Sequence, residues 1–522
     1  MEAQVQALLK QHEEDELRHR KDQERIAYLQ ELISMRTRTI FAKKAEQSSG
    51  EQLSLFDDIE LAHCEAVLEE KIEHVKAHDR KPKRKDLVNS GSLPVVTETY
   101  DFESPAEGSV HIGYKTVRKL IHKPEEFYIL EQRYETRKIE DEYGTVIIST
   151  APENLTDDAF SDTMIDTSVV SHVIYGKTVM ALPLYRQEQD LARKGINLSR
   201  QTMSNAVFKA YDAIKPVTDL IADYIIKADN CRADETRLNI IGLNGDKARL
   251  ANPDSAKTSY VWLYMTATGY HPAYCYRVGP SRKYSVPAAF FGTGTDRYLQ
   301  TDDYGAYFRL ENVINVPCWA HIRRYFVTAQ KSGRHDYQTF SGKMIAMIDT
   351  MFKAEDIILS DLSSMKEDEK YYIARCNARK RTVKPIMESI YKELDAIKDS
   401  VLPKSLLAKA VNYALDLKED IFHFFDDGRL TLTNNQAERE GIKPLVIGRK
   451  NWMFSDTVKG AEVTCGMYSL IETALHNNLN PEKYVSWLLG SLPYQERKDF
   501  DYTIYLPWSE SIPDDIKLNK TK

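Results

Sequence analysis

A change in hydrophobic pattern between residues 228 and 331 limits the fold of this chain more than any other feature. Three short segments of strand character, RADETRLNII, SYVWLYMTAT and AYCYRVG, precede a helical stretch at residues 284–291. A strand that ends in LQTDD, a short helix, the strand NVINVPCW and the helix AHIRRYFVTAQ then follow. Strands that alternate with helices favour a sheet covered by helices. We therefore expect an α/β core with a mixed sheet in the element order βββαβαβα, whose first part is residues 228–334.

The region 161–227 precedes this core and is predicted to hold three helices. Gly195 ends the second helix, and Ser199 is a favourable N-cap for the third. Two helices joined by a short turn suit a helix-turn-helix unit that reads a DNA major groove. In that interpretation the last helix presents Arg200, Gln201, Ser204 and Asn205 to the DNA. A plain helical hairpin is the commoner alternative.

The chain after residue 334 is almost wholly helical in character. Residues 335–428 carry many lysines and glutamates and are broken only at KSGR and VLPK, so we predict a large helical insertion. Residues 429–455 are expected to complete the core with a final helix. Residues 456–522 are predicted to form a C-terminal helical region, with a polar, loosely ordered tail after Pro493.

The N-terminal third is predicted to hold several small regions. Residues 1–42 have an imperfect apolar stripe that indicates a helix, with a short coiled coil as one option. Residues 43–93 are read as a linker followed by the basic run RKPKRK, in which Lys81, Lys83 and Arg84 either contact a DNA backbone or are merely solvated. Residues 94–160 alternate with period two and predict a small antiparallel β domain.

Composition excludes several classes of protein. The net charge is −7, so any nucleic-acid contact must come from local basic patches. No apolar run reaches the roughly 18 residues that a membrane helix needs, and no signal sequence begins the chain. The six cysteines form no CxxC pair, which favours reduced thiols and predicts no zinc. We expect a cytoplasmic protein with no membrane partner.

Three acidic residues occupy positions that suit metal-assisted chemistry. Asp234 lies within a strand, Asp302 ends a strand, and Glu438 follows the turn NN in the run NNQAERE. Carboxylates are the ligands that Mg²⁺ prefers, and two such ions can assist phosphoryl transfer. Each acid alone is more often a turn former or a helix cap. Glu235 and Asp303 are adjacent competitors for the same roles.

Basic side chains surround these acids in the sequence. They are Arg323 and Arg324 after His321, and Arg439, Lys443, Arg449 and Lys450 near Glu438. The arginines and lysines can hold phosphates, and His321 can assist proton transfer or orient a phosphate. A salt-bridged surface and a structural histidine are the alternatives.

Several segments, in order, resemble the insertion sequence 66 family of bacterial DDE transposases. They are ADET, LQTDDYGAY, CWAHIRRYF, NNQAER, GRKNWMF and SLIETALHNNLNPEKYVSWLL, together with leader-like and helix-turn-helix-like segments nearer the N-terminus. The resemblance implies an RNase H-like core interrupted by a helical insertion. It also implies Mg²⁺-dependent (or Mn²⁺-dependent) DNA cleavage and strand transfer at the ends of a mobile element.

Carried over residue by residue, the family's catalytic and metal-binding triad falls on Asp234, Asp302 and Glu438. The family pattern favours Asp302 over Asp303 and Glu438 over Glu440. There are two departures from it. Residues 94–150 have no cysteine where the family usually carries a zinc-finger-like segment, and one extra residue is present near 440–441.

The expected partners are double-stranded DNA, as terminal repeats and as target, and further copies of the chain. Accessory transposition proteins and a nucleoid-associated location follow from the same resemblance. Two alternatives stay open: a catalytically silent DNA-binding protein derived from a transposase, and an RNase H-like nuclease that acts on RNA or damaged DNA.

Overall fold

The computed structural model describes residues 127, 136–141, 144–149, 160, 163, 165–244, 258–292, 296–331, 339–493 and 499–518. The chain divides into two compact units, one of residues 43–152 and one of residues 1–42 and 153–522. The predicted N-terminal helix, the linker and the basic run with Lys81, Lys83 and Arg84 lie outside the described residues. Within the predicted small β domain, β1 (Thr136–Asp141) and β2 (Gly144–Ser149) form an antiparallel hairpin.

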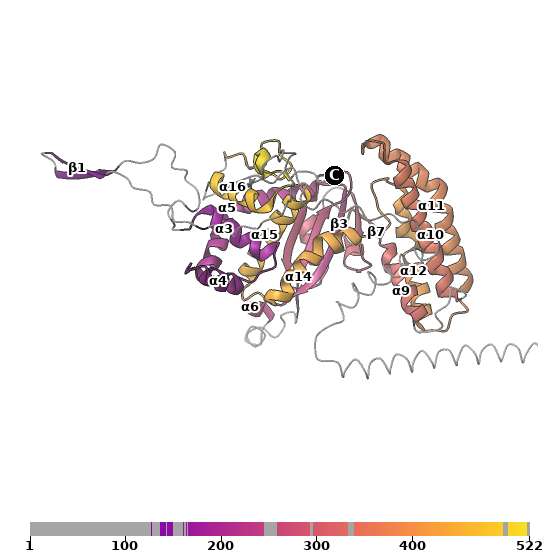
Figure 1. Ribbon diagram of the computed structural model, residues 1–522. Coiled ribbons are helices and arrows are strands. Elements are labelled where there is room, and N and C mark those ends of the chain that lie inside the picture. Colours follow the sequence, from indigo (N-terminus) through magenta and orange to yellow (C-terminus); the bar gives the residue numbers. More distant parts are fainter. Residues whose placement is uncertain are drawn as a thin grey trace, which may run out of the picture. The chain divides into compact units, whose positions relative to one another are not determined.

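The larger unit is built on a five-stranded mixed sheet (Figure 1). Its strands are β3 (Asn230–Leu238), β4 (Ser259–Thr266), β5 (Tyr274–Gly279), β6 (Arg297–Thr301) and β7 (Val313–Pro317), in the spatial order β5-β4-β3-β6-β7. The pairs β5-β4 and β4-β3 are antiparallel, whereas β3-β6 and β6-β7 are parallel. The intervening elements are α6 (Ile241–Asn244), α8 (Ser285–Phe291), the 3₁₀ turn η2 (Tyr307–Arg309) and α9 (Trp319–Lys331). The predicted order of strands and helices is confirmed except for α6, a short helix between β3 and β4 that the sequence pattern did not predict.

One face of the sheet packs against α14 (Lys443–Trp452) and α15 (Val458–His476), which lie across it in Figure 1. Apolar residues that alternate along β4, such as Val261, Leu263 and Met265, form this core layer. The backbone of the edge strand β5 is bonded to α15. Tyr274 N donates to the Thr473 hydroxyl at 3.0 Å, and Tyr276 N donates to the Ser469 hydroxyl at 2.8 Å. This edge is therefore covered by a helix.

The opposite face of the sheet carries an aromatic layer. Tyr264 stacks on Phe290 with ring centroids 3.9 Å apart, and Trp262 meets Tyr307 edge to face at 5.8 Å. Both rings of β4 are fully buried. The alternation of β4 thus sends aliphatic side chains to one layer and aromatic side chains to the other.

Three helices precede the sheet as predicted: α3 (Thr167–Thr178), α4 (Leu184–Arg193) and α5 (Arg200–Lys227). Gly195 has a left-handed φ of 82° after α4, and the Ser199 hydroxyl caps α5 by accepting from Thr202 N. α5 continues through Pro216 to Lys227. Buried Ile214, Ile221 and other apolar residues at helical spacing offset the backbone hydrogen bond that the proline loses.

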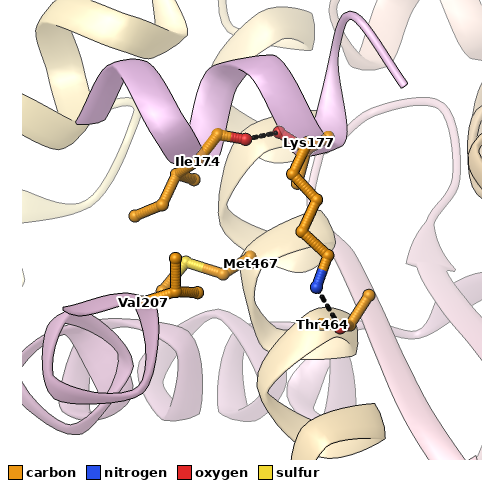
Figure 2. Close-up of a pocket in the computed structure, with 6 residues that line it drawn as sticks. Ile174, Lys177, Val207, Thr464 and Met467 are labelled. Carbon is orange, nitrogen blue, oxygen red and sulfur yellow. Dashed lines mark hydrogen bonds between the residues drawn. The ribbon is translucent and has the colours of Figure 1, made fainter. Parts of the chain in front are cut away.

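A small cavity lies among α3, α5 and α15 (Figure 2). The Lys177 side chain extends along the cavity beside Ile174, Val207 and Met467, and its ammonium donates to the Thr464 hydroxyl at 3.0 Å. Burial lowers the pKa of Lys177 to about 8. None of the acids or basic residues singled out by the sequence lines this cavity.

Four helices form a second cluster, here called the helical block: α10 (Phe340–Asp361), α11 (Glu369–Ile397), α12 (Leu406–Asp416) and α13 (Lys418–Phe422). Figure 1 shows α10, α11 and α12 packed side by side next to α9. Its apolar core is continuous with Val316 at the end of β7 and with Trp319 and Phe326 of α9. The block therefore packs on the end of the sheet where Asp302 lies.

The C-terminal segment departs from the expectation of a loose tail. After α16 (Pro481–Ser491), residues 499–518 pack back on the helices: Tyr502, Tyr505 and Ile516 are buried, and Asn480 N donates to Ile516 O at 2.7 Å. The polar composition suggested disorder, but its spaced aromatic and aliphatic residues bury enough surface to order the segment. Among the described helices, none is long and apolar enough to cross a lipid bilayer.

Candidate active site

The pairing of β3 with β6 lines up two of the acids. The parallel register sets Arg232 opposite Gln300 and ends there. Asp234 and Asp302 each follow two residues later. They therefore lie at the same level along two neighbouring segments of the sheet. Ligands of open α/β sheets commonly bind at such carboxyl ends of parallel strands.

Glu438 approaches from a different element. It lies in the π-helical segment η4 (Ala437–Ile442), in which Lys443 N donates to Glu438 O five residues back. A π-helical turn holds one residue more than an α-helical turn and occurs often at functional sites. The extra residue noted near 440–441 falls inside this segment.

The π segment docks on the same sheet face as Asp234. Gly441 lies against Leu263, the β4 partner of Asp234, so closely that a Cβ there would be 2.1 Å from Leu263 Cδ2. Tyr276 on β5 donates its hydroxyl to Gly441 O at 2.6 Å. These contacts hold Glu438 over the part of the sheet that carries Asp234.

The three carboxyl groups share a strongly anionic environment. Burial raises the pKa of Asp234 well above its usual value, and the charges of Asp302, Glu235 and Glu438 raise it further. Burial is also the main cause that raises the pKa of Asp302 and that of Glu438, and Asp302 adds to the increase at Glu438. Asp302 and Glu438 therefore make ionisation of Asp234 harder, an effect that a bound cation would relieve.

The competitor Glu235 is engaged on the other face of β3. Its carboxylate accepts a hydrogen bond from Tyr307 OH at 2.6 Å and pairs with Arg282. Arg282 also lies 3.7 Å from Asp302 Oδ2. The contacts of Glu235 are those of a structural ion pair beside the site.

The other two competitors have surroundings of their own. Burial raises the pKa of Asp303 to about 6, and the charges of Asp302, of Asp416 on α12 and of Asp420 on α13 raise it further. Glu440 accepts from Tyr274 OH at 3.1 Å and from Gln436 Nε2 at 2.7 Å. Of each pair, Asp302 and Glu438 are the members whose charges act on Asp234.

His321 and Arg324, both predicted, contact Glu438 from α9. His321 Nε2 lies 3.3 Å from Glu438 Oε1, and Arg324 Nη2 lies 3.9 Å from Glu438 Oε2. Burial, with the charge of Arg324, lowers the pKa of His321 to about 4, so the ring is neutral near pH 7. Buried His321 Nδ1 and Arg324 Nε have no hydrogen-bond partner in the part of the chain that the structure describes.

Of the remaining predicted basic residues, two are hydrogen-bonded to neighbouring side chains and three are exposed. Arg323 is held by Asp349 through contacts of 2.7 and 3.1 Å, and Arg449 donates to Thr236 at 3.1 Å. The exposed ones are Arg439, Lys443 and Lys450 near Glu438.

The predicted DNA-reading residues lie at the start of α5. Arg200, Gln201 and Asn205 are exposed there and Ser204 is partly buried. Gln201 Nε2 donates to Asn205 Oδ1 at 3.0 Å. The exposed side chains of this turn are free of the core and available to a partner.

Sequence reasoning missed the polar side chains that support the acids. Arg282, Arg232, Gln300 and Gln436 were not singled out. One signal was present: Arg232 is a charged residue in a strand whose neighbours are buried, two positions before Asp234. Gln300 and Gln436 precede Asp302 and Glu438 by the same spacing.

The donor set has the chemistry of a site for a hard divalent cation. Within the described ranges, no three His, Cys, Asp or Glu side chains are gathered closely enough to form a ready metal cluster. The acids nevertheless supply oxygen ligands and repel one another. Asn434, 1% exposed, adds a buried Oδ1 without a partner in those ranges. The residues present therefore fit Mg²⁺ or Mn²⁺ by ligand type and by charge.

Comparison with known proteins found three relatives in Sinorhizobium fredii (strain NBRC 101917 / NGR234). The uncharacterized protein y4qI is 26% identical over 93% of this chain and 89% of its own length. The uncharacterized protein y4jD is 28% identical over 81% and 82%, and the uncharacterized protein y4hP is 26% identical over 63% and 59%. No solved structure matches the chain.

A family model matches a region of the chain that extends beyond the sheet. The model of the Transposase IS66 family covers residues 162–463, from the helices α3–α5 through the sheet and the helical block to the start of α15. The match thus includes every element that carries one of the three acids. This chain belongs to the IS66 family of transposases.

Proposed function

We propose that this chain is a DDE transposase that cleaves DNA at the ends of an insertion sequence and joins them to target DNA. The observation that carries the proposal is the arrangement of Asp234, Asp302 and Glu438, in which the charges of Asp302 and Glu438 raise the pKa of Asp234 and that of Asp302 raises the pKa of Glu438. The mixed sheet, with Asp234 on β3 and Asp302 directly after the adjacent parallel strand β6, supports an RNase H-like core.

Asp234, Asp302 and Glu438 would hold the divalent cations. Bound as a pair, Mg²⁺ or Mn²⁺ ions supply charge stabilisation to the attacking and leaving oxygens of a phosphodiester. The three carboxylates are ionised when such cations are present and are held on three separate elements. Their burial strengthens every electrostatic interaction in the site.

Neighbouring side chains orient the acids and the DNA. The neutral ring of His321 contacts one oxygen of Glu438, and the guanidinium of Arg324 contacts the other. These two contacts keep the carboxylate turned toward the site. Arg282 does the same for Asp302. Exposed Arg439 and Lys450, with Lys443, are suited to phosphate contacts, whereas Arg323 would first have to leave Asp349.

Recognition of the element ends is assigned to α4 and α5. The N-terminus of α5 presents Arg200, Gln201 and Asn205 to solvent, and its positive dipole end favours phosphate. Further copies of the chain would be needed to hold two DNA ends together, which symmetric association provides.

The test is a cleavage and joining assay on duplexes that carry the ends of the chain's own element, with Mg²⁺. Asp302→Asn and Glu438→Gln are expected to lower the rate on the order of 10³-fold, because each removes a charged cation ligand. The matched controls Asp303→Asn and Glu440→Gln change the adjacent carboxyls that are not assigned to cation binding and should stay within about tenfold of wild type.

Two results would overturn the proposal. Wild-type protein that binds the element ends but cleaves no strand would indicate a silent DNA-binding protein. Cleavage that is equal in Asp302→Asn and wild type would exclude these acids as the catalytic centre.

A further inference from the structure

Each of the three acids is preceded, two residues earlier, by a buried or partly buried polar side chain. The pairs are Arg232 with Asp234, Gln300 with Asp302, and Gln436 with Glu438. Along a strand, residues two apart point to the same face. Arg232 and Gln300 are also direct partners in the parallel register of β3 and β6. A polar layer therefore lies immediately beneath the acidic one.

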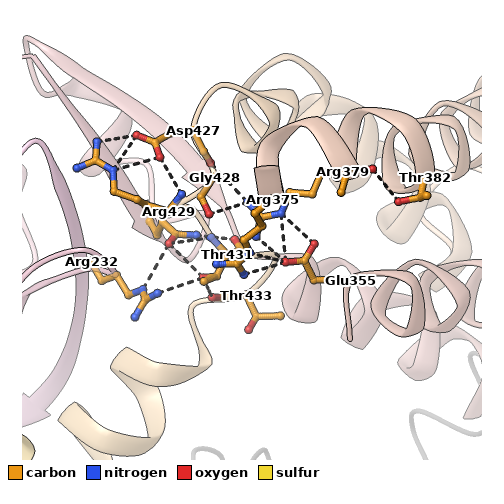
Figure 3. A network of polar contacts seen from close by, with 12 residues as sticks. Arg232, Glu355, Arg375, Arg379, Thr382, Asp427, Gly428, Arg429, Thr431 and Thr433 are labelled. Atoms are coloured by element: carbon orange, nitrogen blue, oxygen red, sulfur yellow. Dashed lines mark hydrogen bonds and ion pairs between the residues drawn. The ribbon is translucent and has the colours of Figure 1, made fainter. Parts of the chain in front are cut away.

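Arg232 is the centre of this layer. Its Nε donates to Gln300 Oε1 at 3.4 Å, and its Nη1 donates to Gln436 Oε1. Its Nη2 donates to Thr431 Oγ1 at 3.3 Å, as Figure 3 shows. One planar guanidinium thus contacts side chains from β6, from the turn before the π segment, and from the segment that leads to that turn.

The lead-in segment, here called the strap (residues 427–433), is itself held to the sheet. Gln300 Nε2 donates to Thr431 O at 2.6 Å, and Thr431 Oγ1 donates to Gln300 Oε1 at 3.1 Å. Arg429 pairs with Asp229 at the start of β3 through contacts of 2.8 and 3.0 Å. The position of the turn before Glu438 therefore depends on β3 and β6, the strands of the other two acids.

The surroundings of Arg232 are costly for folding alone. The side chain is 2% exposed, and its hydrogen bonds in the described part of the chain go to neutral amide and hydroxyl oxygens. A buried cation without a carboxylate bonded to it gains little stability from such a site. Its rigid fork of donors is well suited to fixing three neighbours at once.

We propose that Arg232 is a positioning residue, which holds the acid-bearing elements in register through Gln300 and Gln436. This inference rests on the proposed function of Asp234, Asp302 and Glu438. It assigns no chemical step to Arg232, which acts on the geometry of the three carboxylates. Second-layer contacts of this kind commonly tune metal affinity.

The test measures Mn²⁺ binding to the full-length protein without DNA, by titration calorimetry and by electron paramagnetic resonance of free Mn²⁺. Arg232→Lys keeps the charge but loses the fork, and Gln436→Leu removes one acceptor while Arg232 stays. Both variants are expected to bind Mn²⁺ roughly 10–100-fold more weakly than wild type. Turnover should fall in parallel, while the affinity for element-end DNA is unchanged.

Arg297→Lys is the matched control. Arg297 is also 2% exposed and belongs to β6, but it donates to Ile226 O and Ala228 O at 2.8 and 3.4 Å, away from the acids. Its replacement should lower the melting temperature and leave Mn²⁺ affinity as in wild type. A purely structural role for Arg232 would give both arginine variants the same pattern.

The outcomes separate this inference from the proposed function. If Asp302→Asn abolishes Mn²⁺ binding and cleavage but Arg232→Lys and Gln436→Leu bind Mn²⁺ as wild type does, the positioning role is wrong and the proposed function stands. If Asp302→Asn cleaves like wild type, the proposed function itself has failed.

Discussion

At the scale of single residues, the fold holds several carboxyl groups close together, which lowers the stability of the native state. Asp234 is raised in pKa first by burial and then by Asp302, Glu235 and Glu438. A carboxyl whose pKa is raised on folding favours the native state less and less as the pH rises, because the unfolded chain ionises more easily. Such destabilised clusters are typical of sites where activity needs charge that folding would avoid.

Replacing Asp234 by Asn should therefore stabilise the metal-free protein. We expect a gain of about 0.5–2 kcal/mol near pH 8 and a smaller gain near pH 5, because the raised pKa makes the native carboxyl take up a proton more readily as the pH falls. Mg²⁺ should raise the melting temperature of wild type and leave that of Asp234→Asn nearly unchanged. Calorimetric melting at both pH values, with and without Mg²⁺, measures this; a variant less stable than metal-free wild type at pH 8 would contradict it.

At the scale of elements, the π-helical segment decides where Glu438 lies. It leads directly into α14, whose buried Leu445 lies in the core that packs on the sheet. Close contact of Gly441 with Leu263 and the hydrogen bond from Tyr276 fix the segment on β4 and β5. The absence of a Cβ at residue 441 is what allows this approach.

Gly441→Ala should destabilise the protein by about 1–3 kcal/mol, because the added Cβ overlaps the Leu263 side chain. Gly490→Ala is its control: this glycine of α16 has nothing within 4 Å of a built Cβ. That change should stabilise by about 0.4–1 kcal/mol through the helix preference for alanine. Denaturant unfolding compares the two, and equal effects in both would refute the role of close packing at residue 441.

At the scale of the whole molecule, one polar network joins the helical block to the sheet (Figure 3). Glu355 of α10 accepts hydrogen bonds from Arg375 and Arg379 of α11, and Arg379 also reaches Gly428 O of the strap at 3.3 Å. Gly428 permits the close approach, since a Cβ there would lie 1.9 Å from Tyr372 O. The block is thereby connected to the strap that leads to Glu438.

Replacing Glu355 should lower the free energy of unfolding more than most other changes in the helical block. Burial alone would raise the pKa of Glu355, but hydrogen bonds and charge from Arg379 and Arg375 hold it below its usual value. Its contribution is therefore present above the unfolded pKa and is lost as the pH falls. Glu355→Leu leaves two buried arginines without their carboxylate and should cost about 3–5 kcal/mol at pH 7.

The control for Glu355 is an exposed ion pair between the same two helices. Lys343 and Glu393 lie 2.7 Å apart, and both side chains are more than a third exposed. Glu393→Gln should change the free energy of unfolding by only about 0–1 kcal/mol. Chemical denaturation followed by circular dichroism compares the two variants, and similar losses would contradict the prediction.

Local patterns were enough to predict most of the strands and helices between residues 165 and 331, though not α6. Periodicity and caps such as Ser199 depend on neighbours within a few residues, so the strand and helix order of residues 228–331 could be derived from them. The tail at 499–518 could not, because Tyr505 and Ile516 are ordered by contacts with distant helices. The acids were found as motif members, and their chemical roles remain predictions.

The sequence by itself determined the family resemblance, the alternation of strands and helices, and three acids with one close competitor each. The tertiary structure alone decided that Glu235 faces Arg282 and Tyr307, and that residues 437–442 form a π-helical segment. It also brought Arg232 to Gln436, 204 residues away. Side-chain contacts across such separations leave no local pattern, because they depend on how the sheet, the strap and the helices pack together.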